Sequence, residues 1–450
     1  MRKLFGTDGI RAVAGEAPLD PRTIYAVGVA LAHQLKINGG SPTVILGMDT
    51  RESGSWIAGI LTRGLEHGGA MVESAGIITT PAIAYLARRH KFSAGVVISA
   101  SHNPWQDNGI KIFGGDGYKL PDEVELRIED EIFRQLESLT SADLSHAEPP
   151  AADARYRAQY EEFLLSAVPN LNLGDLKLVI DCANGAASVI APELFARLGG
   201  SVQLTHAQPD GRNINANCGA LYPAVVAAET SATGSDIGVT FDGDADRSLF
   251  ADAQGSVVNG DAILLLAARD LKSRNMLRGD AVVATTMSNM GLEAALRRDQ
   301  IKMLRAPVGD KYVLEMMQAN AASLGGEQSG HILFPHLATT GDGLLTALVI
   351  LDLVRRAGKP LHELTADLKV FPQVIVNVRV REKKPLLEIE TIATPIRAAE
   401  EELNGNGRVV IRYSGTEPLA RVMIEAESEE AMKRHSTAIA QAIRNELGAE

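Results

Sequence analysis

The sequence has little cysteine and no long apolar run. Its only cysteines are Cys182 and Cys218, too few for a disulfide framework or a cysteine-based zinc site, so a reducing compartment fits best. The longest apolar stretch, residues 344–354, is interrupted by a threonine and an aspartate and falls short of the roughly 20 residues that span a bilayer. Residues 1–9 contain no apolar run, which predicts no secretory signal. We therefore expect a cytoplasmic protein with no membrane segment.

A net positive charge is also lacking. The chain has 44 lysines and arginines against 56 aspartates and glutamates, a net charge of -12. This balance argues against a general nucleic-acid-binding surface and against adhesion to anionic membranes. An anionic substrate would therefore need locally gathered arginine and lysine side chains. At 450 residues the chain exceeds the roughly 250–300 residues at which one hydrophobic core stops growing, so several domains are expected.

Several well-known loop motifs are missing. The sequence contains no Gly-x-x-x-x-Gly-Lys-Ser/Thr loop, and Gly115-Asp116-Gly117 lacks the third glycine of a dinucleotide-binding loop. Nucleoside triphosphates and NAD therefore lose support as ligands. Ser101 has a serine two positions before it and an asparagine two positions after it. It does not lie in a Gly-x-Ser-x-Gly nucleophile elbow, so a hydrolase of that kind is not indicated.

Short runs of β-branched residues are present, each ending in a polar, glycine-containing turn and usually followed by a helical pattern. These runs are residues 43–48, 95–99, 176–181, 237–241 and 281–286. The alternation predicts α/β domains with largely parallel strands. After Pro372 the pattern changes to antiparallel strands flanked by helices, which predicts a small α+β domain. The strands are expected at 374–380, 408–412 and 421–427, and the helices at 385–403 and 429–447.

The predicted fold class is therefore α/β, with three similar mixed-sheet domains followed by a C-terminal α+β domain. A low-complexity stretch over residues 141–154 marks the first boundary, and glycine and proline punctuation marks the two later ones. The predicted domains are residues 1–152, 153–254, 255–369 and 370–450.

Three aspartates follow the apolar run 237–241. In an extended chain the side chains of Asp242, Asp244 and Asp246 would point to one side and converge on one hard cation. An EF-hand is rejected, because its required glycine and glutamate positions hold other residues. A solvated acidic turn remains the alternative. Magnesium sites usually keep coordination positions for a substrate or phosphoryl oxygen.

Polar residues also follow the run 95–99, at the end of a strand where open α/β sheets bind ligands. Ser101 is a candidate nucleophile there, although a Ser-His-Asn turn is more often structural. Lys111 follows a nearby turn and could face the same cleft, and the alternative is an ordinary surface lysine.

Two further segments offer groups for a sugar phosphate. In residues 412–418 an arginine, two hydroxyls and the amides of a glycine turn suit a phosphate monoester. A hairpin turn with an incidental arginine is the alternative. In residues 325–331 a carboxylate, an amide, a hydroxyl and a histidine suit hydrogen bonding to sugar hydroxyls. His331 could also exchange protons near neutral pH, or be structural.

Taken in order, these segments and Phe5-Gly6-Thr7-Asp8-Gly9-Ile10-Arg11 resemble the α-D-phosphohexomutase superfamily over nearly the whole chain. The opening motif, Gln328 and the run 210–219 resemble its phosphoglucosamine mutase branch. Two positions depart from that branch: Ala12 replaces a usual glycine, and Ala220-Leu221-Tyr222 replaces a usual Ser-Thr-His.

The resemblance implies four domains around a central cleft and an isomerase acting on a sugar phosphate. It implies Ser101 as the phosphoserine, and one Mg²⁺ per active site held by Ser101, Asp242, Asp244 and Asp246. The implied catalytic residues at the reacting end are Ser101, Lys111, Arg11, His331 and Arg247. The implied substrate-binding residues are Glu327, Ser329, Arg412, Ser414, Gly415, Thr416 and Arg421.

The implied reaction interconverts glucosamine 6-phosphate and glucosamine 1-phosphate through a bisphosphate, with a sugar bisphosphate as primer. The alternative is a phosphoglucomutase/phosphomannomutase of broad specificity. The resemblance also allows a homodimer.

Overall fold

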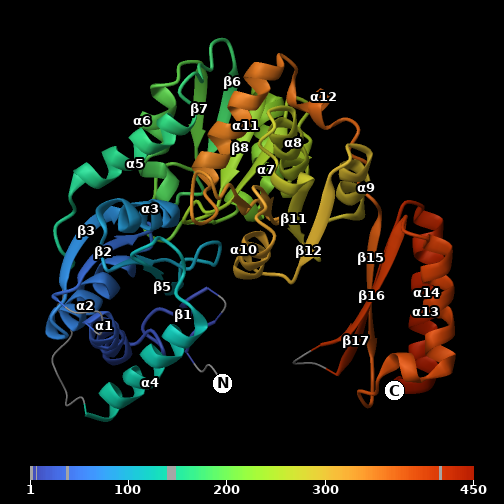
Figure 1. Ribbon diagram of the computed structural model, residues 1–450, viewed down its shortest axis with the longest axis horizontal. Coiled ribbons are helices and arrows are strands. Elements are labelled where there is room, and N and C mark those ends of the chain that lie inside the picture. Colours follow the sequence, from blue (N-terminus) through green and yellow to red (C-terminus); the bar gives the residue numbers. More distant parts are fainter. Residues whose placement is uncertain (1–3, 7, 37–39, 139–147, 415–417, 450) are drawn as a thin grey trace. The chain divides into compact units, whose positions relative to one another are not determined.

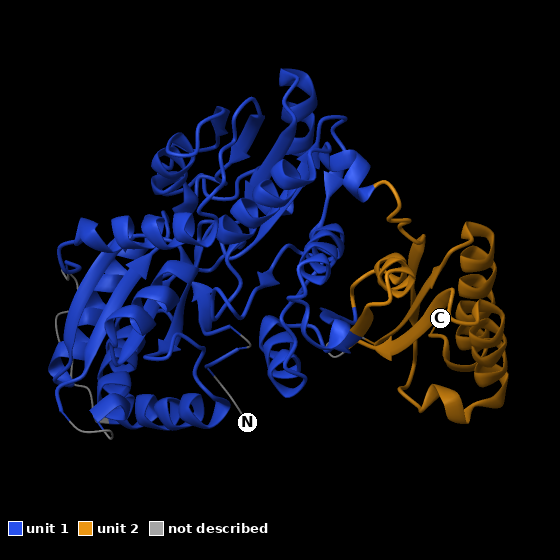
Figure 2. Ribbon diagram, turned by 45° about the horizontal axis from the view of Figure 1, so that its top comes forward, with its two compact units in different colours: residues 1–286, 304–365 blue, residues 287–303, 366–450 orange. Residues whose placement is uncertain are grey.

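The computed structural model describes residues 4–6, 8–36, 40–138, 148–414 and 418–449 (Figure 1). The chain forms two compact units (Figure 2): residues 1–286 with 304–365, and residues 287–303 with 366–450. Among the described helices, none has the length and apolar character needed to cross a membrane.

The first sheet of the larger unit has the strand order β1-β5-β4-β2-β3. Its middle strand β4 pairs parallel with β2 and antiparallel with β5, so the sheet is mixed. The strands are β1 (Ile10–Val13), β2 (Thr43–Met48), β3 (Met71–Ile77), β4 (Ala94–Ile98) and β5 (Asp107–Gly114). The associated helices are α1 (Pro21–Lys36), α2 (Gly54–His67), α3 (Thr80–His90) and α4 (Asp122–Ser138).

Helices α1 and α2 pack closely over this sheet because glycines face each other across their crossing. A Cβ atom on Gly64 would lie 2.2 Å from the carbonyl oxygen of Tyr25, and one on Gly28 would lie 2.5 Å from that of Leu61. Only glycine allows the two backbones to approach this far. The resulting core joins α1, α2 and α4 to β2 and β4.

The second sheet repeats the mixed pattern, with the order β10-β9-β8-β6-β7. Strand β8 is buried along its whole length, which is why it reads in the sequence as an apolar run. The strands are β6 (Lys177–Asp181), β7 (Ser201–Thr205), β8 (Ile237–Phe241), β9 (Ser248–Asp252) and β10 (Val257–Val258). The helices are α5 (Ala154–Ala167), η1 (Ala186–Val189), α6 (Ala191–Ala196), η2 (Gly219–Leu221) and α7 (Pro223–Thr233).

The third sheet has the order β12-β11-β13-β14, with β11 parallel and β14 antiparallel to β13. The strands are β11 (Ala281–Thr285), β12 (Lys302–Ala306), β13 (Gly325–Gly326) and β14 (Ile332–Leu333). The helices are α8 (Gly260–Ser273), η3 (Arg278–Asp280), α10 (Asp310–Ala319), α11 (Gly343–Ala357) and α12 (Leu361–Thr365).

The smaller unit contains an antiparallel sheet of order β15-β17-β16. The strands are β15 (Gln373–Arg379), β16 (Gly407–Tyr413) and β17 (Leu419–Ala426). The helices are α9 (Met290–Arg298), η4 (Leu386–Glu388), α13 (Glu390–Leu403) and α14 (Glu429–Leu447). Helices α13 and α14 share the core of this sheet. The fold class expected from the sequence, three mixed α/β sheets followed by an α+β part, is confirmed.

Candidate functional site

Ser101 lies three residues beyond the end of β4, in a loop whose backbone is held in an unusual conformation. Its φ is +53°, in the left-handed region, which costs a residue other than glycine about 1–3 kcal/mol. Its side chain is buried, and its Oγ donates a 2.6 Å hydrogen bond to Asp242 Oδ2. The serine therefore points at the first aspartate of the acidic run.

A buried polar network holds the start of this loop. The Ser101 amide donates to Ser99 Oγ at 2.9 Å, and Ser99 Oγ donates to Asp49 Oδ2 at 2.6 Å. Asp49 also forms a buried ion pair with Arg51. Burial is the largest influence on Asp49 and raises the pKa of its carboxyl, although Arg51 and Ser99 act in the opposite direction.

The three aspartates that follow β8 converge as the sequence predicts, but the chain reaches that arrangement differently. Oxygens of Asp242, Asp244 and Asp246 all lie within 4.8 Å of one another. The segment is a turn rather than an extended strand, because Ala245 has φ +55° and its amide donates to the carbonyl oxygen of Asp242 at 3.0 Å. The assumption of an extended chain was therefore wrong, and the turn brings the carboxylates together.

This acidic loop has the chemistry of a divalent-cation site. Asp244 Oδ1 and Asp246 Oδ1 are buried and have no hydrogen-bond partner, which leaves two oxygens able to bind a cation. Burial and the two neighbouring carboxylates raise the pKa of Asp242 well above its ordinary value. Carboxylate oxygens are the ligands that hard cations such as Mg²⁺ prefer, so the loop could hold one.

Lys111 on β5 is buried beside the acidic loop. Its Nζ lies 2.8 Å from Asp244 Oδ2, 2.9 Å from Asp8 Oδ2 and 3.6 Å from Asp246 Oδ2. Burial alone would lower the pKa of Lys111, but these three carboxylates outweigh it and raise the pKa. The reading of Lys111 as an ordinary surface lysine is therefore wrong.

The ion pairs continue from Lys111 into a closed chain of alternating charges. Asp8 Oδ1 lies 2.5 Å from Lys119 Nζ, which also pairs with Asp310. His331 Nε2 lies 3.7 Å from Asp310 Oδ2, and His331 Nδ1 lies 3.7 Å from Asp246 Oδ1. Burial would lower the pKa of His331, but these acids, Asp246 first, raise it to about 9. Acidic and basic side chains from segments far apart in the sequence thus neutralise one another.

A cavity of about 370 Å³ lies beside this ring of ion pairs. Arg11 and Arg247 line it, and the Arg11 guanidinium pairs with Asp8 at 2.5 Å. The Arg247 amide donates to Asp242 Oδ1 at 3.2 Å. Burial, followed by the charges of Arg247 and Arg11, lowers the pKa of His102, which also lines the cavity, to about 4.

Glu327 lines the same cavity from the turn between β13 and β14. Its Oε1 accepts a 3.1 Å hydrogen bond from the Gly309 amide, and its Oε2 accepts a 3.2 Å bond from Ser329 Oγ. Gln328 points elsewhere and donates to Asp261 Oδ2 at 3.2 Å. The larger unit thus gathers most of the candidate residues: Arg11, Ser101, Lys111, Asp242, Asp244, Asp246, Arg247, Glu327 and His331.

The remaining candidate residues lie in the smaller unit. Arg412 on β16 and Arg421 on β17 are paired across the two strands. Ser414 is buried, and its carbonyl oxygen accepts a 2.6 Å hydrogen bond from Lys383 Nζ. The candidates Gly415 and Thr416 lie outside the described residues.

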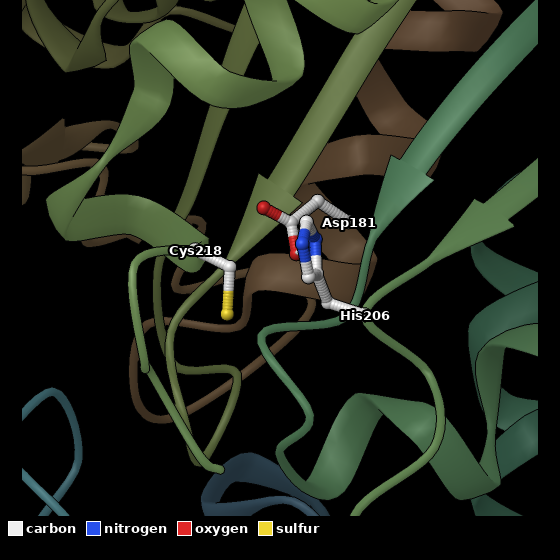
Figure 3. A group of neighbouring side chains, drawn as sticks. All are labelled: Asp181, His206 and Cys218. Atoms are coloured by element: carbon white, nitrogen blue, oxygen red, sulfur yellow. The ribbon is translucent and has the colours of Figure 1, made fainter.

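A second cluster that resembles a metal site consists of Asp181, His206 and Cys218, with ligand atoms within 4.8 Å of one another (Figure 3). The Asp181 carboxylate already has four polar partners: the amides of Ala183 and Gly219, the Thr240 hydroxyl and a His206 ring nitrogen. Burial raises the pKa of the Cys218 thiol to about 12. Because the carboxylate is fully used within the protein, we interpret this cluster as structural.

Sequence reasoning did not identify several residues that complete the site, among them Asp8, Lys119, Asp310 and Arg51. Arg51 lies three residues after β2, a parallel neighbour of β4. Because the carboxyl ends of such strands meet at one edge of a sheet, this position was a usable signal. Asp8 was visible only as part of the opening motif, since its lysine partners, Lys111 and Lys119, are about a hundred positions away.

Comparison with known proteins agrees with this geometry. Models of the phosphoglucomutase/phosphomannomutase domains match in order: alpha/beta/alpha domains I, II and III over residues 2–138, 155–255 and 259–371, and the C-terminal domain over residues 375–442. Phosphoglucosamine mutase of Koribacter versatilis (strain Ellin345) is 58% identical over 454 residues, covering 100% of this chain and 98% of that protein. Phosphoglucosamine mutase of Solibacter usitatus (strain Ellin6076) is 51% identical, covering 99% of each chain.

Solved structures have the same fold. A phosphoglucomutase/phosphomannomutase family protein from Burkholderia thailandensis matches with a TM-score of 0.78 at 24% identity, covering 98% of this chain and 99% of that one. Aspergillus fumigatus N-acetylphosphoglucosamine mutase, in complex with GlcNAc-6P and magnesium, matches with a TM-score of 0.65 at 18% identity, covering 98% and 96%. The chain therefore belongs to the α-D-phosphohexomutase superfamily and, within it, to the phosphoglucosamine mutase family, whose members are isomerases.

Proposed function

We propose that this protein interconverts glucosamine 6-phosphate and glucosamine 1-phosphate through a phosphoserine at Ser101 and a sugar bisphosphate. The contact that carries the proposal is the 2.6 Å hydrogen bond from Ser101 Oγ to Asp242, inside a cluster that also holds Lys111. A nucleophile, a cation-binding carboxylate group and a buried ammonium together suit phosphoryl transfer, in which charge stabilisation and positioning provide most of the catalysis. The full-length similarity to phosphoglucosamine mutases supports the choice of sugar.

Asp242, Asp244 and Asp246, with an oxygen on Ser101, would hold one Mg²⁺. The Oδ1 atoms of Asp244 and Asp246, which are buried and accept no hydrogen bond, fit this role. When bound, the ion supplies positive charge to the phosphoryl oxygens.

In the first transfer, the free hydroxyl of the sugar phosphate attacks the phosphorus on Ser101. A bond from phosphorus to the sugar oxygen forms as the bond from phosphorus to Oγ breaks; the hydroxyl proton passes to a base, and the released Oγ takes up a proton. The bisphosphate then reorients in the site. Ser101 Oγ gives up its proton as it takes back the other phosphoryl group, and the sugar oxygen that leaves receives a proton. Lys111, Arg247 and Arg11 stabilise the negative charge during both transfers.

Lys111 or His331 handles the proton. In the first transfer the neutral form of either side chain accepts the hydroxyl proton, and in the second transfer its cation donates that proton to the sugar oxygen that leaves. Burial alone would lower the pKa of both groups, but nearby carboxylates raise it, which favours the cation that donates the proton.

The other roles complete the proposal. Glu327 and Ser329 hold sugar hydroxyls, and the smaller unit binds the phosphate that is not reacting through Arg412, Ser414, Gly415, Thr416 and Arg421. In this proposal the chain has four domains. Residues 1–152 carry the loop with Ser101, residues 153–254 carry the acidic loop, residues 255–369 carry the loop with Glu327, and residues 370–450 carry the phosphate site. A cytoplasmic location, a homodimer and a sugar bisphosphate primer belong to the same proposal.

The decisive experiment is turnover of the purified protein on glucosamine 6-phosphate, glucose 1-phosphate and mannose 1-phosphate, with Mg²⁺ and a trace of glucose 1,6-bisphosphate. We expect the highest kcat/KM for the glucosamine phosphate and almost no turnover by Ser101→Ala. Equal or better use of glucose or mannose phosphate would favour the broad-specificity alternative with the same mechanism. A Ser101→Ala variant that keeps most of its activity would disprove the phosphoserine.

A further inference from the structure

The segment from the end of β7 to the first residue of η2, residues 206–219, has no role in the mechanism above. It nevertheless contacts the loop after β4 that carries Ser101, which we call the serine loop. We call residues 206–219 the asparagine loop. Asn215 in its middle is buried, with 6% of its surface exposed. Its Nδ2 donates hydrogen bonds to the carbonyl oxygens of Ser101 at 3.0 Å and Asn103 at 3.1 Å.

A second side chain holds the same two carbonyl groups. Arg51 Nη2 donates to the Ser101 oxygen at 3.2 Å and to the Asn103 oxygen at 2.5 Å. Each carbonyl oxygen thus accepts one hydrogen bond from Arg51, which follows β2, and one from Asn215 of the asparagine loop. The four bonds fix the backbone on both sides of His102, directly beside the strained Ser101.

The asparagine loop is itself anchored at both ends by Asp181 (Figure 3). His206 Nδ1 lies 3.1 Å from Asp181 Oδ1 at the start of the loop, and the Gly219 amide donates to Asp181 Oδ2 at 2.8 Å at its end. In the middle of the loop, the backbone amide of Asn215 donates to the Ala183 carbonyl oxygen at 2.9 Å. The cluster interpreted above as structural therefore sets the position of Asn215.

The acidic loop packs against the same point. A Cβ atom on Gly243 would lie 2.5 Å from the Ser101 carbonyl oxygen and 2.9 Å from Asn215 Nδ2. Gly243 lies between Asp242 and Asp244, so the absence of its side chain lets three loops meet. A shift of Asn215 would therefore move Ser101 relative to the aspartates it faces.

We propose that Asn215 is a positioning residue for Ser101, which holds the left-handed serine loop so that Oγ stays aimed at the acidic loop during both phosphoryl transfers. Without the two hydrogen bonds from Asn215, only Arg51 would hold these carbonyl groups, and the Ser101 backbone would relax more readily from φ +53°. Oγ would then turn away from Asp242, and a misplacement of about 1 Å can cost roughly 100-fold in rate. This proposal rests on the proposed function of Ser101.

The test compares Asn215→Asp and Asn215→Ala with Asn217→Asp and Asn217→Ala. Asn217 is a matched control because it lies in the same loop and has a similar backbone, with φ +54° against +57° for Asn215, but its side chain is exposed. Three quantities are measured for each variant: the rate at which glucose 1,6-bisphosphate phosphorylates Ser101, by intact-protein mass spectrometry; kcat and KM; and Tm.

For Asn215→Asp, which places a carboxylate against two carbonyl oxygens, we expect the phosphorylation rate and kcat to fall roughly 10- to 100-fold with KM nearly unchanged. Asn215→Ala should fall less, because Arg51 still holds both carbonyls, and the Asn217 variants should match the wild type. If Asn215→Asp does not fold, Asn215→Ala decides the question.

Rates of folded Asn215 variants within about twofold of the Asn217 variants would overturn the proposal. So would a loss confined to the unfolded fraction, since that would make Asn215 merely structural. A wild-type protein that acquires no phosphoryl group on Ser101 would instead refute the proposed function itself.

Discussion

At the scale of single residues, the site concentrates backbone strain where the chemistry is expected. Ser101 and Ala245 both have left-handed backbones, each at a cost of about 1–3 kcal/mol. Neighbours hold both residues in place: the Ala245 carbonyl oxygen accepts the Gly343 amide at 2.9 Å, and Ser101 is held by Arg51 and Asn215. The loops that carry the nucleophile and the carboxylates are therefore set before a substrate binds.

The acidic loop leads to a prediction about Mg²⁺ binding. At a hundred times its dissociation constant, Mg²⁺ should stabilise the folded protein by about 2.7 kcal/mol and raise Tm, and EDTA should reverse the shift. Asp244→Asn removes a carboxylate whose Oδ1 accepts no hydrogen bond, so the Mg²⁺-induced change in Tm should shrink to less than half. Differential scanning calorimetry with and without Mg²⁺ measures the change.

Two controls isolate the binding effect. KCl at equal ionic strength should not raise Tm in the same way, and Asp116→Asn, at an exposed aspartate, should keep the full shift. A full Mg²⁺ shift in Asp244→Asn would show that the ion binds elsewhere.

The sequence revealed the residues of the site that lie in short motifs, and missed those that meet only through the fold. The spacing of Asp242, Asp244 and Asp246 was readable because the three are neighbours along the chain. Asn215 and Ser101 are 114 positions apart, and no local pattern indicates that they touch. The turn at Ala245 was also missed, since alternating aspartates are equally compatible with a strand.

At the scale of helices and strands, local patterns predicted most elements closely. The runs 43–48 and 237–241 are β2 and β8, and the expected helix 429–447 is α14. The expected helix 385–403 was too long at its start. Residues 386–388 form a separate 3-10 turn, and α13 begins at Glu390 because Ile389 has an extended backbone.

Helix α11 begins at a buried carboxylate, and this gives a prediction about pH. Asp342 Oδ1 accepts the Leu345 amide at 2.9 Å, and its Oδ2 accepts the Tyr160 hydroxyl at 2.7 Å. Burial nevertheless raises the pKa of Asp342 from 3.8 to about 6. The folded state therefore binds this proton more tightly than the unfolded state, and the stability it contributes is lost as pH rises from about 4 through about 6.

Asp342→Asn removes this titration while keeping an oxygen that accepts hydrogen bonds. We expect the difference in Tm, variant minus wild type, to increase between pH 4 and pH 7. The corresponding change in the free energy of unfolding is about 3 kcal/mol for a shift of about two pKa units. Calorimetry of both proteins across this range measures it, and a difference in Tm that stays flat or falls would contradict the assignment.

At the scale of the whole molecule, the sequence predicted the order of three α/β parts and one α+β part but not how the chain is shared between the two units. Residues 287–303 group with the smaller unit, although α9 lies between strands β11 and β12 in an ordinary α/β pattern. The segment makes long-range contacts with this unit, among them a hydrogen bond from the Met290 amide to Glu425 Oε1 at 2.5 Å. Local periodicity cannot indicate such a partner.

Glu425 should therefore be important for the stability of the smaller unit. It is fully buried, and its Oε2 accepts a 2.7 Å bond from Arg408 Nε. Glu425→Ala removes this bond and the acceptor of the Met290 amide, which should lower the stability of the unit by about 3–5 kcal/mol. Because several domains can unfold separately, hydrogen exchange of the amides in β15, β16 and β17 is the suitable measurement.

Glu427→Ala is the matched control two residues away. Glu427 forms an exposed ion pair with Lys369 at 2.9 Å, and such pairs contribute about 0–1 kcal/mol. Equal effects of the two substitutions on hydrogen exchange would show that the buried pair has no special importance.

The assignment of residues 287–303 to the smaller unit also determines its covalent connectivity. The chain passes between the units three times, after residues 286, 303 and 365. A protease that cut only after residue 365 would break the covalent link between residues 366–450 and the rest of the chain. The released segment would still contact α9 through the hydrogen bond from the Met290 amide to Glu425. The smaller unit can therefore not be excised intact with one cut, and a recombination event that transferred residues 366–450 alone would leave α9 behind and separate it from Glu425.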